Sequence, residues 1–275
     1  MSPPPALGLA LGGGGALGFA HVGVLAALHD RGLRPDAYAG TSAGAVVAAL
    51  AAFGVGPEAI RERLGALRWR SVSDPARSRL GFLDNAELGE LLVGALGPVR
   101  VEEANVPLAV VAVDVHTGER VVIREGPLAL AVRASAAVPG VFVPVPVGGR
   151  LLIDGAVIEN VPVRPLRALG ARIVVGVNVI GAPPHRPVRT AAQVLTNAAY
   201  IALQAGARRP PPDGADVLVE PDLSGRSVWD ARDLPALWDA GWRAGEGAAP
   251  KVAAAVSATP FGDPPVRKTD LRREA

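Results

Sequence analysis

Short apolar runs alternate with segments of helical periodicity along most of the 275-residue chain. Strands are predicted at five short runs, most of them rich in Val, Leu and Ala: residues 7–11, 36–40, 108–115, 173–179 and 217–220. Helices are predicted at residues 19–30, 43–53, 58–67, 128–137, 163–169, 191–207 and 234–256. Because continuous apolar strands separated by helices are buried on both faces, this alternation predicts a three-layer α/β/α fold with a mainly parallel central sheet.

Two features predict hairpins within this pattern. Residues 121–124 follow the third of these runs after a turn-like sequence at 116–119. Residues 141–147 and 151–153 flank Gly148-Gly149, a dipeptide that favours a tight turn. The sheet is therefore expected to be mainly, but not wholly, parallel.

Composition excludes several classes of chemistry. The chain is 49% hydrophobic and 20% charged, which is typical of a folded protein. Its 28 basic and 26 acidic residues nearly balance, so no dedicated nucleic-acid surface is expected. It has no cysteine, which excludes disulfides, thiolate metal sites and cysteine nucleophiles. The four histidines, none paired at metal-ligand spacing, are His21, His29, His116 and His185. We therefore expect no metal and no cofactor.

Length and apolar patterning bound the organisation of the chain. A single domain is expected over residues 1–258, followed by a flexible tail at 259–275. The N-terminal residues lack the basic leader of a signal peptide. The longest apolar stretch, residues 43–55, is about 13 residues long, whereas a membrane-spanning helix needs roughly 20. We expect a cytoplasmic location, compatible with peripheral contact to a membrane.

A glycine-rich loop at residues 12–18 lies between the first predicted strand and helix. Such a loop brings backbone N–H groups close to a ligand, and the helix start favours an anion. Gly13, Gly15 and Gly18 match the spacing of a dinucleotide-binding loop. The same loop is also compatible with an oxyanion hole, or with a tight turn that binds nothing. The next strand ends without the acidic residue that a dinucleotide site needs, which disfavours the nucleotide hypothesis.

The sequence Gly40-Thr41-Ser42-Ala43-Gly44 stands between a predicted strand and an Ala-rich helix. This is the context of a nucleophile elbow, in which a sharp turn exposes a serine at the end of the sheet. The alternative is a serine that caps the helix on a glycine-flanked turn.

A serine nucleophile needs a base, and two candidates stand out. Asp154 ends an apolar strand and is followed by Gly155, at the kind of position where open α/β sheets build their sites. The alternative for Asp154 is an ordinary turn-forming Asp-Gly pair. His21, one turn into the first helix, is the weaker candidate because it is expected to pack against the sheet.

Taken together, these motifs resemble the patatin-like phospholipase family. The similar blocks lie at residues 9–25, 39–45, 133–142 and 154–162, and the resemblance spans about residues 6–180. It implies a Ser–Asp dyad without histidine, with Ser42 as nucleophile and Asp154 as base. It also implies an oxyanion hole from the backbone N–H groups of three residues, Gly13, Gly14 and Gly15. Supporting positions carried over from the family's motifs are Gly18, Gly40, Gly44, Gly155, Asn160 and Ser135.

The resemblance implies a serine lipid acyl hydrolase of the phospholipase A or lysophospholipase type, acting through an acyl-enzyme without metal or cofactor. The expected partner is a lipid or another acyl ester, with no nucleic acid and no named protein partner. One departure stands out: Leu17 occupies a position where the family usually has Arg or Lys. It favours an alternative, a catalytically weak lipid-binding or regulatory protein.

The region after the third predicted helix is the least regular part of the chain. It holds apolar residues at Trp69, Leu80, Phe82, Leu83, Leu88, Leu91 and Leu92. Residues 70–98 are predicted to form a lid over an acyl groove, with ordinary core as the alternative.

Overall fold

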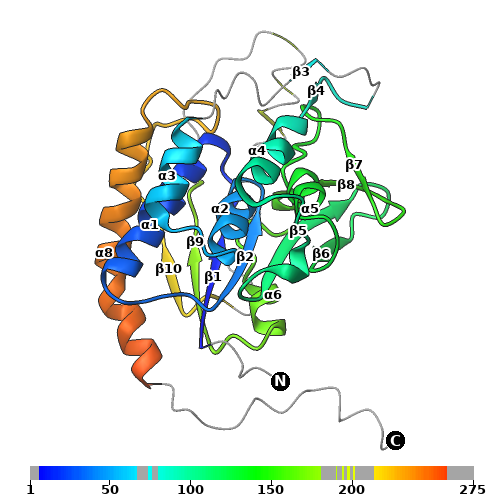
Figure 1. The fold of residues 1–275 in the computed structure, drawn as a ribbon. Helices are drawn as coiled ribbons and strands as arrows, with labels where there is room; N and C mark the ends of the chain where they lie inside the picture. The colour runs from blue at the N-terminus through cyan, green and yellow to red at the C-terminus, as the bar shows by residue number, and fades with distance from the viewer. Residues whose placement is uncertain are drawn as a thin grey trace, which may run out of the picture.

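A computed structural model describes residues 6–66, 80–180 and 214–258, together with the backbone of 74–75 and residues 190, 194, 197–198 and 201. Within this part of the chain the central sheet has eight strands (Figure 1). Seven follow one path in space: β10 (Val217–Val219), β9 (Ile173–Val177), β1 (Leu7–Leu11), β2 (Ala37–Thr41), β5 (Leu108–Asp114), β8 (Arg150–Asp154) and β7 (Val145–Val147). The eighth, β6 (Arg120–Ile123), also pairs with β5.

The sheet has a parallel part and an antiparallel end. Strands β10, β9, β1, β2 and β5 are parallel to one another. Strand β6 forms the expected hairpin with β5, and β7 forms one with β8, which is itself antiparallel to β5. The second hairpin is shorter than predicted, because its first strand begins at Val145 and not at Val141. The mainly parallel sheet is confirmed.

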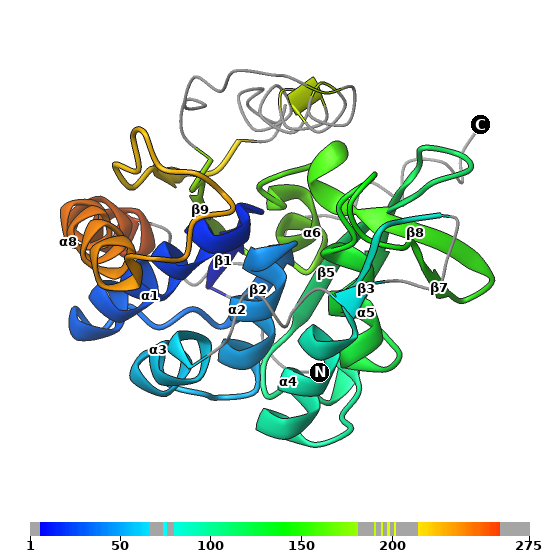
Figure 2. The same ribbon diagram turned by 90° about the horizontal axis from the view of Figure 1, so that it is seen from above.

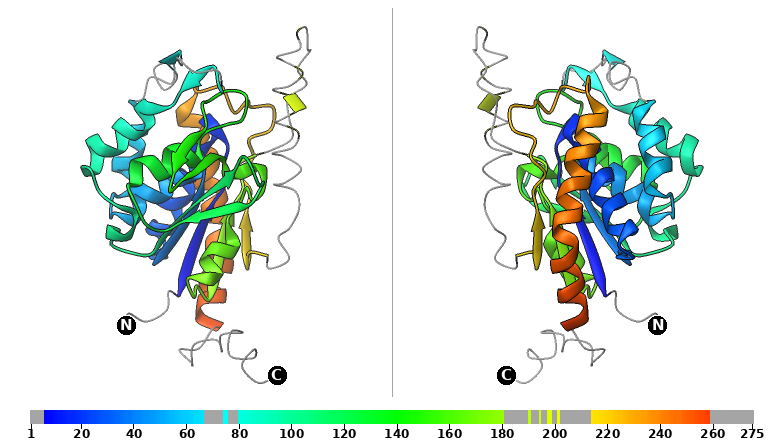
Figure 3. Two further views of the ribbon diagram at one scale, coloured as in Figure 1. Left: turned by 90° about the vertical axis from the view of Figure 1, so that its right-hand side faces the viewer. Right: turned by 90° about the vertical axis from the view of Figure 1, so that its left-hand side faces the viewer.

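In the described part of the chain, helices cover the two faces of the sheet unequally (Figures 2 and 3). One face carries α1 (Phe19–Asp30), α2 (Ala43–Ala52), α3 (Pro57–Gly65), α4 (Ala86–Leu96), α5 (Leu128–Ser135) and α8 (Leu234–Ala258). The other face carries α6 (Val163–Ala168), which contacts β1, β2 and β9. A separate two-stranded pair is formed by β3 (Asp74–Pro75) and β4 (Leu83–Asp84).

Side chains of β1 explain this inequality. Leu9 and Leu11 point into the large core under α1 and α2. Ala10 points the other way, into a smaller cluster that contains Val163 and Leu166 of α6. Successive residues of a strand face opposite sides, so the large residues build the thick layer and the small ones let α6 pack closely.

One segment differs from its sequence prediction. Residues 86–96, expected to be irregular, form the helix α4, whose Leu88 and Leu92 are buried one turn apart. Two glycines, Gly89 and Gly94, interrupt the apolar pattern, so the sequence did not predict this helix. Leu88 and Leu92 are buried, and Leu88 also lines a pocket at Ser42, so the choice between a lid and ordinary core stays a prediction. Residues 67–73 and 76–79 lie outside the described residues.

Two further expectations concern residues that lie wholly or partly outside the described part of the chain. The predicted helix at 191–207 is helical at residues 194, 197–198 and 201, and its other residues lie outside the described part. The tail at 259–275 lies outside it as well, so the division into a domain at 1–258 and a tail stays a prediction. Of the helices that the structure describes, none is long and apolar enough to cross a membrane.

Candidate active site

Ser42 and Asp154 reach the same point of the sheet from opposite directions. Strand β6 occupies one side of β5. The other side is shared: Val111 pairs with Thr41 at the end of β2, and Ala112 pairs with Asp154 at the end of β8. Because Val111 and Ala112 are adjacent, the carboxyl ends of β2 and β8 meet beside β5. Ser42 directly follows β2, so the topology brings it next to Asp154.

Ser42 occupies a strained turn between β2 and α2. Its backbone has φ 53° and ψ −124°, and it is the one non-glycine residue with positive φ in the described ranges. A conformation of this kind costs about 1–3 kcal/mol and persists only where the surroundings enforce it. The side chain makes no capping hydrogen bond to α2, which argues against the helix-cap interpretation. The strand–turn–helix geometry is that of a nucleophile elbow.

The glycines of this turn permit a close backbone approach. A Cβ atom on Gly44 would overlap the carbonyl oxygens of Leu11 and Gly12 at the end of β1. A Cβ atom on Gly40 would overlap the backbone of Ala45 in α2. The elbow is therefore pressed against the start of the glycine-rich loop, with no room for a side chain at either position.

The Asp154 carboxylate is buried and hydrogen-bonded. The Oδ1 atom accepts a hydrogen bond from the Ala156 amide at 2.9 Å, and the carboxylate accepts a side-chain hydrogen bond from Ser42. Loss of water disfavours the charged form, so burial raises the pKa of Asp154 to about 6, against the opposing effect of the two hydrogen bonds. A carboxyl group with this pKa is ionised at neutral pH and is a stronger base than an exposed aspartate.

Two side chains hold the backbone around this pair. The Ser135 Oγ accepts a hydrogen bond from the Ser42 amide at 2.9 Å and donates one to the Val111 carbonyl at 2.6 Å. The Asn160 Oδ1 accepts a hydrogen bond from the Gly13 amide at 3.0 Å. Both side chains are buried. Ser135 thereby joins the elbow to β5, and Asn160 joins the glycine-rich loop to the segment that follows β8.

The three loop amides expected to form an oxyanion hole differ in this structure. The Gly13 amide is engaged by Asn160. No hydrogen bond engages the amides of Gly14 and Gly15 within the described part of the chain. Gly15 has φ 56°, a conformation that favours glycine, and it lines the same pocket as Ser42. Gly14 and Gly15 are therefore the loop positions with free donors.

His21 has a different place from that of a base. It is fully buried, and its Nε2 donates a hydrogen bond to the Gly12 carbonyl at 2.7 Å. Its Nδ1 has no partner among the described residues. Burial lowers the pKa of His21 to about 4, although the bond to Gly12 opposes this. The ring is therefore neutral at pH 7 and ties the loop to α1. His185 lies outside the described residues.

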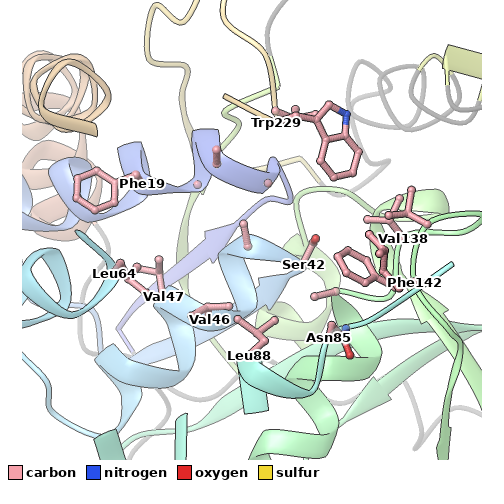
Figure 4. Close-up of a pocket in the computed structure, with 18 residues that line it drawn as sticks. Phe19, Ser42, Val46, Val47, Leu64, Asn85, Leu88, Val138, Phe142 and Trp229 are labelled. Atoms are coloured by element: carbon pink, nitrogen blue, oxygen red, sulfur yellow. The ribbon is translucent and has the colours of Figure 1, made fainter. Parts of the chain in front are cut away.

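An apolar pocket opens at Ser42 (Figure 4). Its volume is about 240 Å³, and no charged side chain lines it among the described residues. Its lining comes from the elbow, the glycine-rich loop and helices α1 to α4, with contributions from β4, the segment after α5 and the segment before α8. The lining residues are Gly15, Ala16, Gly18, Phe19, Ser42, Ala43, Val46, Val47, Leu64, Leu83, Asn85, Leu88, Ala136, Val138, Val141, Phe142, Val228 and Trp229.

Sequence reasoning missed part of this pocket. Leu88 falls within the lid predicted over an acyl groove and does line the pocket, but Asn85 and Trp229 were not singled out. The signal at Trp229 is a single aromatic residue among polar neighbours, which is weak by itself. Leu17, the departure from the family pattern, is buried in the large core and does not line the pocket. The position that the family usually fills with a cation thus contributes core packing here.

Comparison with known proteins decides the family. The sequence model of the patatin-like phospholipases matches residues 9–167. The chain belongs to the patatin-like phospholipase family. That match includes the glycine-rich loop, the elbow at Ser42 and the Asp-Gly pair at Asp154. The resemblance drawn from the motifs is therefore confirmed at the level of the family.

Relatives in this family are longer proteins. An uncharacterized NTE family protein of Mycobacterium tuberculosis is 38% identical over 183 residues, which are 66% of this chain and 51% of the relative. Lysophospholipase NTE1 of Cryptococcus neoformans is 31% identical over 180 residues, which are 63% of this chain and 11% of that protein. The patatin-like chain thus spans about half the length of its mycobacterial relative.

A solved structure supports the fold. VipD from Legionella pneumophila matches 93% of this chain and 67% of its own, with a TM-score of 0.57 and 14% sequence identity. At that identity the likeness bears on architecture alone. Together with the family match, it confirms the three-layer α/β/α fold predicted from the sequence.

Proposed function

We propose that this patatin-like protein is a serine lipid acyl hydrolase, in which Ser42 is the nucleophile and Asp154 the general base. One observation carries the proposal: the strained Ser42 lies at an apolar pocket and is hydrogen-bonded to a buried carboxylate. A nucleophile, a base with raised pKa and an apolar binding pocket are the parts that ester hydrolysis of a lipid needs. Family membership supports the same reaction class.

The reaction follows from this arrangement. The Ser42 Oγ attacks the ester carbonyl carbon while Asp154 takes the hydroxyl proton. The resulting oxyanion accepts hydrogen bonds from the amides of Gly14 and Gly15, where each such donor is worth about 3–4 kcal/mol in serine hydrolases. The alcohol leaves with the proton that Asp154 returns, and acyl-Ser42 remains. Asp154 then deprotonates a water molecule, which attacks the acyl group. The bond to the Ser42 Oγ breaks as Asp154 returns the proton to that oxygen, and the acid is released.

Burial explains how an aspartate can act as this base. An exposed carboxylate has a pKa near 4 and is a weak base for a hydroxyl group. The raised pKa of about 6 makes Asp154 more basic, and its direct hydrogen bond to Ser42 provides the contact for proton transfer. The developing negative charge moves from a buried carboxylate toward the glycine-rich loop, where the start of α1 adds favourable partial charge.

The substrate is a lipid or another acyl ester, of the phospholipase A or lysophospholipase type. Support comes from the apolar lining of the pocket and from the similarity to a protein named as a lysophospholipase. A cytoplasmic location with peripheral membrane contact is part of the same proposal. The hydrolase requires no metal or cofactor in any step derived above.

A fluorophosphonate that labels activated serines tests the proposal. We expect one adduct, mapped to Ser42 by peptide mass spectrometry and lost in Ser42→Ala. Labelling should be slower in Asp154→Asn and unchanged in the control Ser224→Ala, which alters an exposed serine far from the elbow in sequence. An adduct elsewhere, or equal labelling of Asp154→Asn and wild type, would overturn the assignment.

A second candidate is a catalytically weak lipid-binding or regulatory protein. The observation that favours it is Leu17, which is buried at the position of the family's usual cation. It predicts lipid binding to the pocket with no adduct at Ser42. The labelling experiment, combined with a lipid-binding measurement, separates the two.

A further inference from the structure

The two ends of the pocket at Ser42 differ in burial. At one end, Phe19, Val47 and Leu64 are all at most 5% exposed. At the other, Trp229 is 48% exposed, and Phe142 is half-buried. Figure 4 has Phe19, Val47 and Leu64 on one side of Ser42, and Phe142 on the other. The pocket therefore has a closed end between α1, α2 and α3, and an open end toward solvent.

The volume of the pocket limits the length of the chain that it can hold. An apolar cavity of about 150 Å³ holds one benzene molecule, which has six carbon atoms. On the same scale, the 240 Å³ at Ser42 holds about eight to ten carbon atoms. A longer chain would have to leave through the open end and would gain little from its extra methylene groups.

The lining also limits the chemistry of the bound group. No charged side chain borders the pocket among the described residues, and Asn85 has its amide group engaged by Arg133. A phosphate or ammonium group inside the pocket would lose its water without gaining a partner of opposite charge. The enclosed part of the substrate is therefore a hydrocarbon chain.

We propose that this pocket limits the length of the acyl chain that it binds. It favours esters of about eight to ten acyl carbons, with the methyl end against Val47 and Leu64. This inference rests on the proposed function, since it assigns the acyl half of the substrate to the same site. Leu64 of α3 is then a specificity-determining residue, because it forms part of the closed end.

A series of p-nitrophenyl esters from acetate to palmitate tests the proposal on the full chain. We expect kcat/KM to rise about two- to fourfold for each methylene group that becomes buried. The rise should stop at about ten carbons. A rise that continues to palmitate, or no dependence on chain length, would overturn the proposed limit.

Substitutions at the closed end should change the preferred acyl-chain length. Leu64→Ala removes three carbons from the wall, so the preferred chain should lengthen by about three carbons. Leu64→Phe should shorten it. The matched control is Leu50→Ala, which removes the same atoms from a buried leucine of α2 that does not line the pocket. If Leu64→Ala does not fold, Val47→Ala shortens another closed-end side chain and serves the same test. An identical profile for Leu64→Ala and Leu50→Ala would contradict the assignment.

A measurement without catalysis separates this inference from the proposed function. Neutral n-alkanols of six to fourteen carbons are added to Ser42→Ala, and the shift in Tm is recorded. We expect the shift to grow up to about ten carbons and then to level off. Chain-length-dependent binding without any adduct at Ser42 in wild type would contradict only the proposed hydrolase. An adduct at Ser42 with no chain-length dependence would contradict only the proposed pocket limit.

Discussion

Ser42 comes from the parallel part of the sheet and Asp154 from its antiparallel end, and a different physical effect controls each residue. The parallel part holds Ser42 by steric fit, since close backbone contacts at Gly40 and Gly44 enforce a strained turn. The antiparallel end supplies Asp154 by burial, which raises the pKa of the carboxyl group to about 6. One residue is controlled by shape and the other by loss of water, so substitutions in the two regions should affect the protein differently.

The largest effect is expected at Gly44. In Gly44→Ala, the new Cβ atom would overlap the carbonyl oxygens of Leu11 and Gly12. We expect activity below detection and a loss of unfolding free energy of about 3 kcal/mol or more. The control is Gly94→Ala in α4, where a Cβ atom meets nothing within 4 Å. It should leave activity unchanged and stabilise the protein by up to about 1 kcal/mol. Equal urea midpoints for the two variants would contradict the steric account.

Asp154→Asn should separate activity from stability. Removal of the base is expected to lower kcat/KM by about 10²–10⁴-fold. The folded state binds the Asp154 proton more tightly than the unfolded state does, so the buried charge destabilises the protein above pH 6 and not below about pH 4. Asp154→Asn should therefore be more stable than wild type at pH 8, by about 3 kcal/mol, and equally stable at pH 4.

Urea unfolding at the two pH values checks this prediction. The exposed Asp222, substituted by Asn, is the control, because its carboxyl group is not buried and no such gain is expected. The account would be contradicted if Asp154→Asn lost stability at pH 8. That result would mean that hydrogen bonds to the carboxylate stabilise the folded state by more than burial of its charge destabilises it.

Ser135→Ala tests how the turn at Ser42 is held against β5. The substitution leaves the Ser42 amide and the Val111 carbonyl without their buried partner, at a cost of about 1–3 kcal/mol. As a positioning residue, Ser135 should affect kcat by about tenfold and KM little. Ser224→Ala, on the loop before α8, is the serine control, because Ser224 is exposed and does not line the pocket. A change confined to Tm, with kcat unaffected, would leave Ser135 with a structural role alone.

Ser42→Gly carries the smallest expected effect. Glycine adopts the positive φ of this turn without strain, whereas alanine does not. Both variants lack the hydroxyl group, so the difference between them reports the strain. We expect Ser42→Gly to be more stable than Ser42→Ala by about 1–2 kcal/mol in urea unfolding. No difference would mean that the turn relaxes once the side chain is lost.

Much of the parallel part was predictable from the sequence. Apolar strands, helical periodicity and glycines at fixed offsets are local signals, and they located β1, β2 and the turn at Ser42. Local signals could not show that β8 runs antiparallel and meets β2 end to end beside β5. The contact between Ser42 and Asp154, which are 112 positions apart in the sequence, depends on that pairing.

The remaining differences have similar causes. Helix α4 was missed because its glycines weaken the local helical pattern. Burial of Leu88 and Leu92 in the folded protein stabilises the helix nonetheless. The resemblance implied three equivalent loop amides, but Asn160 engages Gly13 through a hydrogen bond that no sequence pattern encodes. His21 illustrates the same limit, since its bond to the Gly12 carbonyl appears only in the folded chain.

The pH dependence of fluorophosphonate inactivation tests the central claim most directly, because it measures the reactivity of the serine and needs no chosen substrate. For wild type, the account predicts a rate constant that rises about tenfold per pH unit below pH 6 and is level above it, as Asp154 ionises. Asp154→Asn should react slowly, with no rise near pH 6. A rise that persists unchanged in Asp154→Asn would contradict the assignment of Asp154 as the base of Ser42.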